Sequence, residues 1–484
     1  MSIIMDGVLS TCLYFGWPGT MHSWSYLLLF GSRVRSDYMR FAAAVWLSTI
    51  MGACLCSIAE ERPNLDAKKL GTILNNDINN ILHWSNGKDI SIDECRSAVV
   101  RMLDLSPGVV AQNVGMPDPV IYRSKVATTW DKHHAEVTKA IWPETAQEDA
   151  ERQSAAMRHL LELGTDPLVL TIQACRERGA PIVASYRMNA EDFYGGELDL
   201  SDFGREHKNL RIPGRNCLDP AQPEVYKHRM AIFTEVANDY DIDGIEFDFR
   251  RWYFMISEPL KNYAVLTQMV ADTRKMLDET AQRKGRKKML LGVRVGPMLE
   301  GAFVKEEFPG AYYGEPTNQS CRNLGLDVKT WVERRLVDYI CPALFSPMGL
   351  PRTKEFVDLA KGSRIGVYPT ISYTPRWAHF DGPMLADSDE TRLRHLRDIC
   401  TETLKCYEDG ADGISLFNWF PYNVPLPGHD APGWGRPRQW PQGYRPDAVG
   451  FGQVQQFMTP KLAHPEALRE CMTQGLPAAL KVAG

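Results

Sequence analysis

The chain has 484 residues, 44% hydrophobic residues and a formal net charge of −5, a composition that excludes a disordered or low-complexity protein. Its mild acidity gives no reason to expect a nucleic-acid partner, because such proteins concentrate positive charge. The length suits one large domain or two to three small ones, since α/β barrels run long as single domains. Aromatic residues make up 10%, with twelve tryptophans, which fits a large core and a sugar-binding cleft equally well.

The N-terminal part of the chain carries the pattern of an export signal. A cation at Arg40 precedes an apolar run over residues 41–53, and small residues follow at Ser57 and Ala59. This is the three-part order of a secretory signal peptide. The apolar run is short for a membrane span, so cleavage after Ala59 is expected.

This pattern divides the chain into a signal region and one exported domain. We expect residues 1–59 to be an N-terminal extension with a signal peptide whose true start is Met39. Residues 60–484 are then a secreted or periplasmic domain. Lipid attachment at Cys54 and an uncleaved membrane anchor are the alternatives. Eight cysteines remain after cleavage, without the CxxC pairs of a zinc site, and export would permit disulfides among them.

From residue 69 onward, strand-forming and helix-forming segments alternate. Eight segments predict strands: 71–77, 108–114, 181–189, 243–249, 289–295, 337–345, 364–372 and 412–420. Apolar residues at three- and four-residue spacing predict helices at 91–105, 166–179, 225–240, 262–285, 327–336, 353–362 and 390–410. Eight alternating units predict a closed (β/α)8 barrel, a single α/β domain. No glycine-rich phosphate loop follows the first strand, so no nucleotide cofactor is expected.

Two long insertions follow strands of this barrel. One covers about residues 115–165 after the second strand. The other, 427–450 after the eighth strand, is rich in Pro, Gly and Trp, and 465–472 predicts a last helix. Loops at the carboxyl ends of barrel strands surround the active site in this fold. No linker divides residues 60–484 into two domains.

The segment 239–252, DYDIDGIEFDFRRW, concentrates charge within a strand-forming sequence. Several acids together in a strand indicate a metal site, an acid/base pair or an ion-pair network. Side chains alternate along a strand, so one set is expected to line the barrel: Gly244, Glu246, Asp248 and Arg250. The apolar set is expected to face the helices: Ile245, Phe247 and Phe249. Asp243, at the strand entrance, predicts a turn or cap.

Glu246 and Asp248 are the predicted catalytic residues. Their Cα atoms would lie roughly 6.5–7 Å apart on one face of the strand. Carboxyl groups at that spacing repel each other, so one pKa rises while the other stays low. This is the electrostatic arrangement of an acid beside a base or nucleophile.

Other predicted strands also end in polar residues. The predicted substrate-binding residues are Asn76, Asp77, Arg187, Asn189, Asp192, Arg250, Arg294, Asn418 and Trp419. Amides and carboxylates bind vicinal hydroxyls, and an indole stacks on the apolar face of a pyranose. Arginine matches a carboxylate or sulfate with paired donors, which favours an anionic sugar.

Three other interpretations of these residues stay open. Arg187 or Arg294 could neutralise the strand-four carboxylates in a structural ion-pair network. A cation could be held by Asp77, Glu246 and Asp248, although no histidine ends a strand, so a zinc site is not expected. His133 and His134 in the long second loop are expected to be solvated, although they could reach the mouth.

With these residues in place, the sequence resembles secreted (β/α)8 glycoside hydrolases over roughly residues 69–425. The stretch DGIEFDFR is similar to the chitinase-like pattern D-G-x-D-x-D-x-E, whose last Glu protonates the glycosidic oxygen. Glu246 and Asp248 match the two middle acids, but Arg250 stands where that Glu would be, so the chitinase mechanism does not carry over. In the larger clan of retaining barrel hydrolases, Glu246 matches the strand-four acid/base, whereas the strand-seven segment 364–372 has no nucleophilic carboxylate.

The resemblance is nearest to glycosyl-hydrolase-like barrels exported by polysaccharide-degrading bacteria. It implies a secreted glycoside hydrolase that acts on an oligosaccharide or polysaccharide through the strand-four carboxylate pair. Either carboxyl could be the acid, and Glu246 is favoured as acid/base with Asp248 as its partner, because the deeper carboxyl is more easily desolvated. The arginines favour an acidic or sulfated substrate. No metal or other cofactor is expected. The alternatives are a non-catalytic carbohydrate-binding barrel and a lyase that uses Mg²⁺ or Ca²⁺ on a sugar acid.

Overall fold

The computed structural model describes the chain in separate ranges within the compact unit Asn64–Gly484. These ranges are 64–77, 82, 91–104, 108–141, 144–189, 199–250, 254–304, 307, 319–344, 349–372, 388–417 and 449–482. The predicted signal peptide lies outside them and stays a prediction. Within the described ranges, no helix combines the length and apolar character needed to cross a bilayer.

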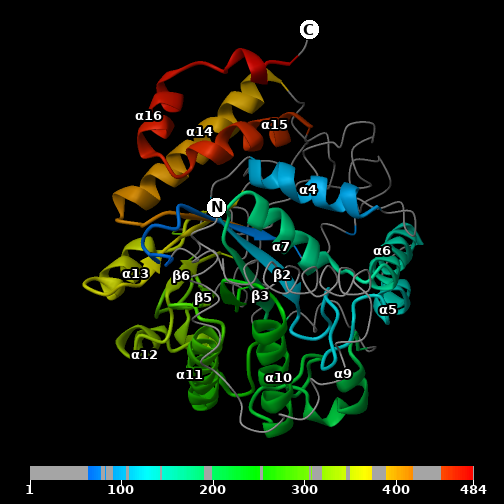
Figure 1. Cartoon of the computed structure of the whole chain (residues 1–484). Helices are drawn as coiled ribbons and strands as arrows, with labels where there is room; N and C mark the ends of the chain where they lie inside the picture. The colour runs from blue at the N-terminus through cyan, green and yellow to red at the C-terminus, as the bar shows by residue number, and fades with distance from the viewer. Residues whose placement is uncertain are drawn as a thin grey trace, which may run out of the picture. The chain divides into compact units, whose positions relative to one another are not determined.

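In the described part of the unit Asn64–Gly484, the strands form one parallel sheet with helices packed around it (Figure 1). Its strands are β1 (Thr72–Asn76), β2 (Val109–Gly115), β3 (Ile182–Arg187), β4 (Gly244–Asp248), β5 (Leu290–Val295), β6 (Tyr339–Pro342), β7 (Gly366–Val367), β8 (Thr370–Ser372) and β9 (Ile414–Phe417). They are ordered β7-β6-β5-β4-β3-β2-β1-β9-β8. Each predicted strand segment contains an observed strand.

The two edges of this order are pieces of one strand, so the sheet closes on itself. β7 and β8 are separated only by Tyr368 and Pro369, and both lie in the predicted segment 364–372. The Tyr368 N–H donates to Ile340 O on β6, and the Ser415 N–H on β9 donates to Pro369 O. The ladder therefore continues across the interruption, which confirms the predicted (β/α)8 barrel.

Eight predicted helices are present. They are α4 (Ile92–Asp104), α7 (Pro167–Glu177), α10 (Pro223–Asp239), α11 (Pro259–Arg283), α12 (Val328–Glu333), α13 (Thr353–Ala360), α14 (Asp389–Glu408) and α16 (Pro465–Thr473). Figure 1 shows α10 and α11 side by side, and these two helices pack against each other on the outside of the sheet. α14 packs against both α16 and the additional helix α15 (Val449–Met458).

The insertion after the second strand is not the continuous loop that was expected. It contains α5 (His134–Ile141) and α6 (Glu144–Glu162). Gln153, Ala156, Met157 and Leu160 are buried on one face of α6, at the three- and four-residue spacing of an amphipathic helix. The pattern was in the sequence, but the surrounding charged residues obscured it. A shorter helix, α9 (Asp202–Glu206), follows β3. The insertion 427–450 lies almost entirely outside the described residues.

The two faces of the strands have different partners. Inside the barrel, a cluster of buried residues fills the space between the strands: Leu70, Ile73, Val109, Ala111, Val183, Leu290, Tyr339, Cys341 and Tyr368. The larger cluster between strands and helices contains Ile245, Phe247 and Phe249, as the alternation of strand four predicted. Glu246 and Asp248 therefore face the barrel interior.

Aspartates at the strand entrances fix neighbouring strands to one another. Asp243 accepts the Ile182 N–H at 2.9 Å, so its predicted role as a cap is confirmed. Asp338 accepts the Leu291 N–H at 2.8 Å, and Asp412 accepts the Val367 N–H at 3.0 Å. Each aspartate lies just before the first residue of one strand, and its carboxylate accepts a hydrogen bond from a backbone N–H of the preceding barrel strand. These acids serve the fold and lie at the end opposite the candidate site.

His395 of α14 makes the stability of the fold sensitive to acid. Its side chain is 2% exposed, and burial lowers its pKa from 6.5 to about 3. Between pH 6.5 and about 3, the unfolded chain therefore binds a proton at this histidine that the folded chain does not bind. The free energy of unfolding consequently decreases as the pH falls below about 6.5, by up to about 1.4 kcal/mol per pH unit. We expect His395→Gln to reduce this acid slope in urea unfolding between pH 7 and 4.5. His464→Gln, at an exposed position, is the control, and an unchanged slope in His395→Gln would contradict the assignment.

Candidate active site

The strand-four carboxylates stand in two successive layers of the barrel interior. In the register of the sheet, Glu246 lies between Ser185 on β3 and Gly292 on β5. One layer closer to the carboxyl ends, Asp248 lies between Arg187 and Arg294. Glu246 is 1% exposed and Asp248 is completely buried. Each carboxylate therefore depends on its neighbours in the barrel for all its polar contacts.

Glu246 is surrounded by hydrogen-bond donors from three other strands. Ser185 Oγ donates to Oε1 at 2.8 Å, and Tyr339 OH donates to Oε2 at 3.0 Å. Asn75 Nδ2 is 3.5 Å from Oε1. Gly292 makes the tyrosine contact possible, because a Cβ there would lie 1.9 Å from Tyr339 Cζ.

The environment of Glu246 favours its protonated form. Burial raises the pKa of this carboxyl, and the charge of Asp248 raises it further. The hydrogen bond from Ser185 and the charge of Arg294 act in the opposite direction without reversing the shift. A carboxyl whose pKa is raised in this way is better suited to donate a proton than an exposed glutamate.

Asp248 is held by N–H donors on both oxygens. Arg294 Nη1 donates to Oδ2 at 2.8 Å, and the backbone N–H of Arg250 donates to Oδ1 at 2.9 Å. Short bonds from a guanidinium and a backbone amide suit an ionised carboxylate. Glu246, with its raised pKa, thus lies on the same strand face as a carboxylate held by two N–H donors. The catalytic roles of the two residues stay a prediction.

Two buried guanidinium groups lie beside Asp248. Arg250 Nε donates to Ala343 O at 2.7 Å, and burial together with the charge of Arg294 lowers the Arg250 pKa to about 9. Burial also lowers the Arg294 pKa. The Arg294 Cζ atom lies 3.9 Å from the ring centroid of Phe417 on β9. Arg294 therefore connects β5 with a strand well separated from it in the sheet order.

A second ion pair joins the first and third strands. Arg187 Nη2 lies 2.5 Å from Asp77 Oδ1, and Arg187 is completely buried. Asn189, just after β3, is 1% exposed, and neither of its amide atoms has a hydrogen-bond partner in the described part of the chain. The same holds for Asn113 of β2. Arg187 is thus the last residue of β3, and Asp77 and Asn189 lie just beyond the carboxyl ends of β1 and β3.

Asn76 lies on the other face of its strand. Its Nδ2 donates to Gln112 Oε1 at 2.7 Å, and Leu74, two residues earlier, belongs to the cluster between strands and helices. Asn75 is the residue that reaches Glu246. The prediction selected the wrong member of an Asn-Asn pair, because the exact register decides which one points inward.

The remaining predictions concern residues in the loops that follow the strands. Asp192, Asn418 and Trp419 lie outside the described residues and stay predictions. His133 Nε2 bonds Asp202 on α9 at 2.8 Å, and the ring of His134 lies 4.3 Å from that of Trp130. Both histidines are therefore engaged within the insertion and its neighbour, rather than free in solvent.

The described residues do not bring metal-ligating side chains together. No group of three His, Cys, Asp or Glu within the described ranges could hold an ion. Asp77, Glu246 and Asp248 are all described, so the predicted cation alternative has no support from their arrangement. The ion-pair interpretation is confirmed for Asp248 with Arg294. Arg187 instead pairs with Asp77, which that interpretation did not include.

Two residues that shape this site, Tyr339 and Asn113, are not among the predicted site residues. Tyr339 precedes Cys341 by two residues, so alternation puts both on the inner face, but its contact with Glu246 depends on Gly292 of another strand. Asn113 follows Val109 and Ala111, which lie in the inner cluster, at the same two-residue spacing. That spacing could have identified Asn113 from the sequence.

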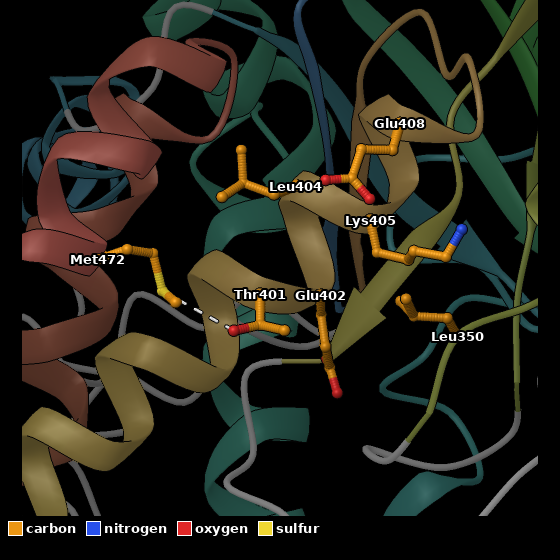
Figure 2. A pocket seen from close by; sticks show the side chains of 7 residues that line it. All are labelled: Leu350, Thr401, Glu402, Leu404, Lys405, Glu408 and Met472. Atoms are coloured by element: carbon orange, nitrogen blue, oxygen red, sulfur yellow. Dashed lines mark hydrogen bonds between the residues drawn. The ribbon is translucent and has the colours of Figure 1, made fainter.

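A shallow groove on the outside of the barrel is separate from these residues. It has a volume of about 380 Å³ and lies along α14 and α16, where Leu404 and Met472 contribute apolar surface (Figure 2). Thr401 Oγ1 is 3.8 Å from Met472 Sδ across it. None of the predicted site residues lines the groove.

Comparison with known proteins connects the chain to glycosyl hydrolases. It is 25% identical over 251 residues to glycosyl hydrolase DigH of Escherichia coli K12, covering 43% of this chain and 54% of that protein. The same figures apply to DigH of Escherichia coli O6:H1. The chain spans about half the length of the curated relatives it matches. No family model matches the sequence.

The solved structures that match the chain include a chitinase and an alpha-L-fucosidase. A chitinase from Chromobacterium violaceum matches with a TM-score of 0.37 and 13% identity, over 80% of this chain and 98% of that one. An alpha-L-fucosidase from Paenibacillus thiaminolyticus matches with a TM-score of 0.37 and 13% identity, over 84% of this chain and 50% of that one. The barrel assignment rests on the strand order and closure of this chain itself.

Proposed function

We propose that this protein is a glycoside hydrolase, with Glu246 as general acid/base and Asp248 as nucleophile or base. The observation that carries the proposal is the contrast between the two carboxyls on the inner face of β4. Burial raises the pKa of Glu246, while Asp248 accepts a guanidinium bond at 2.8 Å. The similarity to DigH supports the same reaction class.

The chemistry follows from these two states. A protonated Glu246 gives its proton to the glycosidic oxygen as the bond to the leaving sugar breaks. Asp248 either attacks the anomeric carbon or removes a proton from the water that does so, and either role stabilises an oxocarbenium-like transition state. Carboxyl groups about 5 Å apart suit retention of configuration, and a separation of roughly 6.5–9.5 Å suits inversion.

The charges of the site favour an anionic oligosaccharide or polysaccharide. Arg187, Arg250 and Arg294 are completely buried, and Asp77 and Asp248 are paired with two of them. Burial raises the pKa of Glu246, and whenever Glu246 holds its proton the three guanidinium groups outnumber the two ionised carboxylates. An anionic sugar would balance this surplus, since unbalanced buried charge is costly. The signal-peptide pattern supports action outside the cytoplasm, on an extracellular or periplasmic glycan.

One observation favours a second candidate, a carbohydrate-binding barrel without catalysis. Arg250 occupies the position where the chitinase-like pattern has its acid, and its Nε is committed to Ala343 O. The described strand pieces β7 and β8 carry no carboxylate. In this candidate the strand-four carboxylates would only organise the binding site.

A reducing-end assay distinguishes the two functions. Purified residues 60–484 are incubated with neutral, uronic and sulfated polysaccharides, beside Glu246→Gln and Asp248→Asn. We expect new reducing ends with the unchanged protein and almost none with either variant. Glu300→Gln, a surface carboxylate paired with Lys329, is the control and should retain activity. Binding without release by the unchanged protein would favour the non-catalytic barrel.

A further inference from the structure

Arg294 uses only part of its guanidinium group for contacts within the protein. Its Nη1 donates to Asp248 Oδ2. Its Nε and Nη2 are buried, and neither has a hydrogen-bond partner among the residues that the structure describes. Buried guanidinium donors are normally satisfied, because leaving a charged group without partners is costly. These two donors are therefore available to the oxygens of a ligand.

The two donors form one edge of the planar group. The Nε–H and one Nη2–H of arginine point in nearly the same direction and match the two oxygens of a carboxylate. The Phe417 ring, 3.9 Å from the Arg294 Cζ, and the bond to Asp248 fix the plane of the guanidinium. A group with a fixed plane loses little freedom when it binds, which strengthens recognition.

Other groups on the inner face suit the rest of a sugar ring. Asn113 and Asn189 are buried, and their amide atoms also have no partners within the described ranges. An amide offers both a donor and an acceptor, which is what neighbouring hydroxyls require. Besides the carboxylate-shaped pair of donors on Arg294, the barrel thus offers amide groups on β2 and just after β3 that suit neutral hydroxyls.

We propose that the Nε/Nη2 edge of Arg294 is a subsite for the carboxylate of a uronic acid residue, placed beside Asp248. The inference rests on the proposed glycosidase function and specifies its substrate class. A planar carboxylate accepts both donors of the edge side by side. A sulfate group is also an anion, but its oxygens are arranged tetrahedrally and not in a plane. Comparing the two ligands therefore shows whether Arg294 recognises the planar shape of the carboxylate or only its negative charge.

The first measurement compares ligands on the unchanged protein. Isothermal titration uses oligosaccharides of galacturonate, mannuronate and glucuronate, each beside its carboxyl-reduced counterpart and a sulfated neutral oligosaccharide. We expect at least one uronic oligosaccharide to bind about 10- to 100-fold more tightly than its reduced form, the range of a charged paired hydrogen bond. Equal affinity for the two forms, or no binding of any uronic oligosaccharide, would overturn the subsite.

The second measurement assigns this preference to Arg294. Arg294→Lys keeps the charge but removes the two parallel donors. The affinity for the uronic oligosaccharide, divided by the affinity for its carboxyl-reduced counterpart, should therefore fall towards one. Arg274→Lys is the matched control, because Arg274 is buried but binds Asp338 at the strand entrances, and its ratio should stay high. If Arg294→Lys keeps the full ratio, or if the sulfated ligand binds as tightly as the uronate, the subsite is refuted.

The subsite and the reaction can fail separately. Preferred binding of a uronic oligosaccharide without release of reducing ends would support the subsite and refute the hydrolase. Release from neutral polysaccharides without any acid preference would support the hydrolase and refute the subsite. The ligand comparison needs no substitution, so it remains decisive even if Arg294→Lys does not fold.

Discussion

Replacing Glu246 by glutamine is expected to lower kcat/KM by about three orders of magnitude, within the range for loss of a general acid. Glutamine keeps the shape of the side chain. Its amide oxygen can accept from one of the two hydroxyls, Ser185 or Tyr339, and its amide nitrogen can donate to the other, but it has no acidic proton to transfer. Because the Glu246 pKa is raised, the acid is present below that pKa and lost above it. Activity of the unchanged enzyme should therefore fall as pH rises through the Glu246 pKa.

The pH profile separates catalysis from structure. In Glu246→Gln, the residual kcat/KM should no longer fall at higher pH, since the group responsible for that limb is gone. Steady-state rates on the substrate found in the polysaccharide panel provide the measurement, with Glu300→Gln as a variant that should keep the full profile. If Glu246→Gln retains the alkaline fall, another group is the acid and Glu246 only shapes the barrel.

Gly292→Ala is expected to destabilise the protein by about 2–4 kcal/mol, as overpacking combined with a lost hydrogen bond. The new Cβ would lie 1.9 Å from Tyr339 Cζ and 2.3 Å from Tyr339 Oη. The ring would have to move, although it is completely buried among the inner residues of the barrel. The bond from Tyr339 to Glu246 would then break.

Urea unfolding with a double-mutant cycle tests this cause. In a Tyr339→Leu background, Gly292→Ala should cost much less, because no ring remains at the position of the new Cβ. Gly475→Ala is the control, since no atom lies within 4 Å of a Cβ there. A large cost that persists without the tyrosine ring would show that Gly292 is required for another reason.

The barrel could be predicted because its evidence is local. Every strand segment alternates with a helix segment whose apolar residues recur at helical spacing, and hydrophobic burial makes that pattern specify the layers. The inward direction of Glu246 and Asp248 followed from the two-residue period of β4 and from its apolar alternate positions. α6 carries the same kind of signal at Gln153, Ala156 and Leu160, but its charged residues concealed it.

What the sequence by itself determined was the succession of elements and the face on which each strand residue lies, because both follow from short-range periodicity. Only the tertiary structure decided which of the inward-facing side chains contact one another. The choice of Asn75 over Asn76, the contact of Tyr339 with Glu246 across Gly292, and the position of Arg294 against Phe417 depend on register and closure. These features join strands far apart in the chain, so their physical cause is the packing of a closed sheet rather than any local pattern.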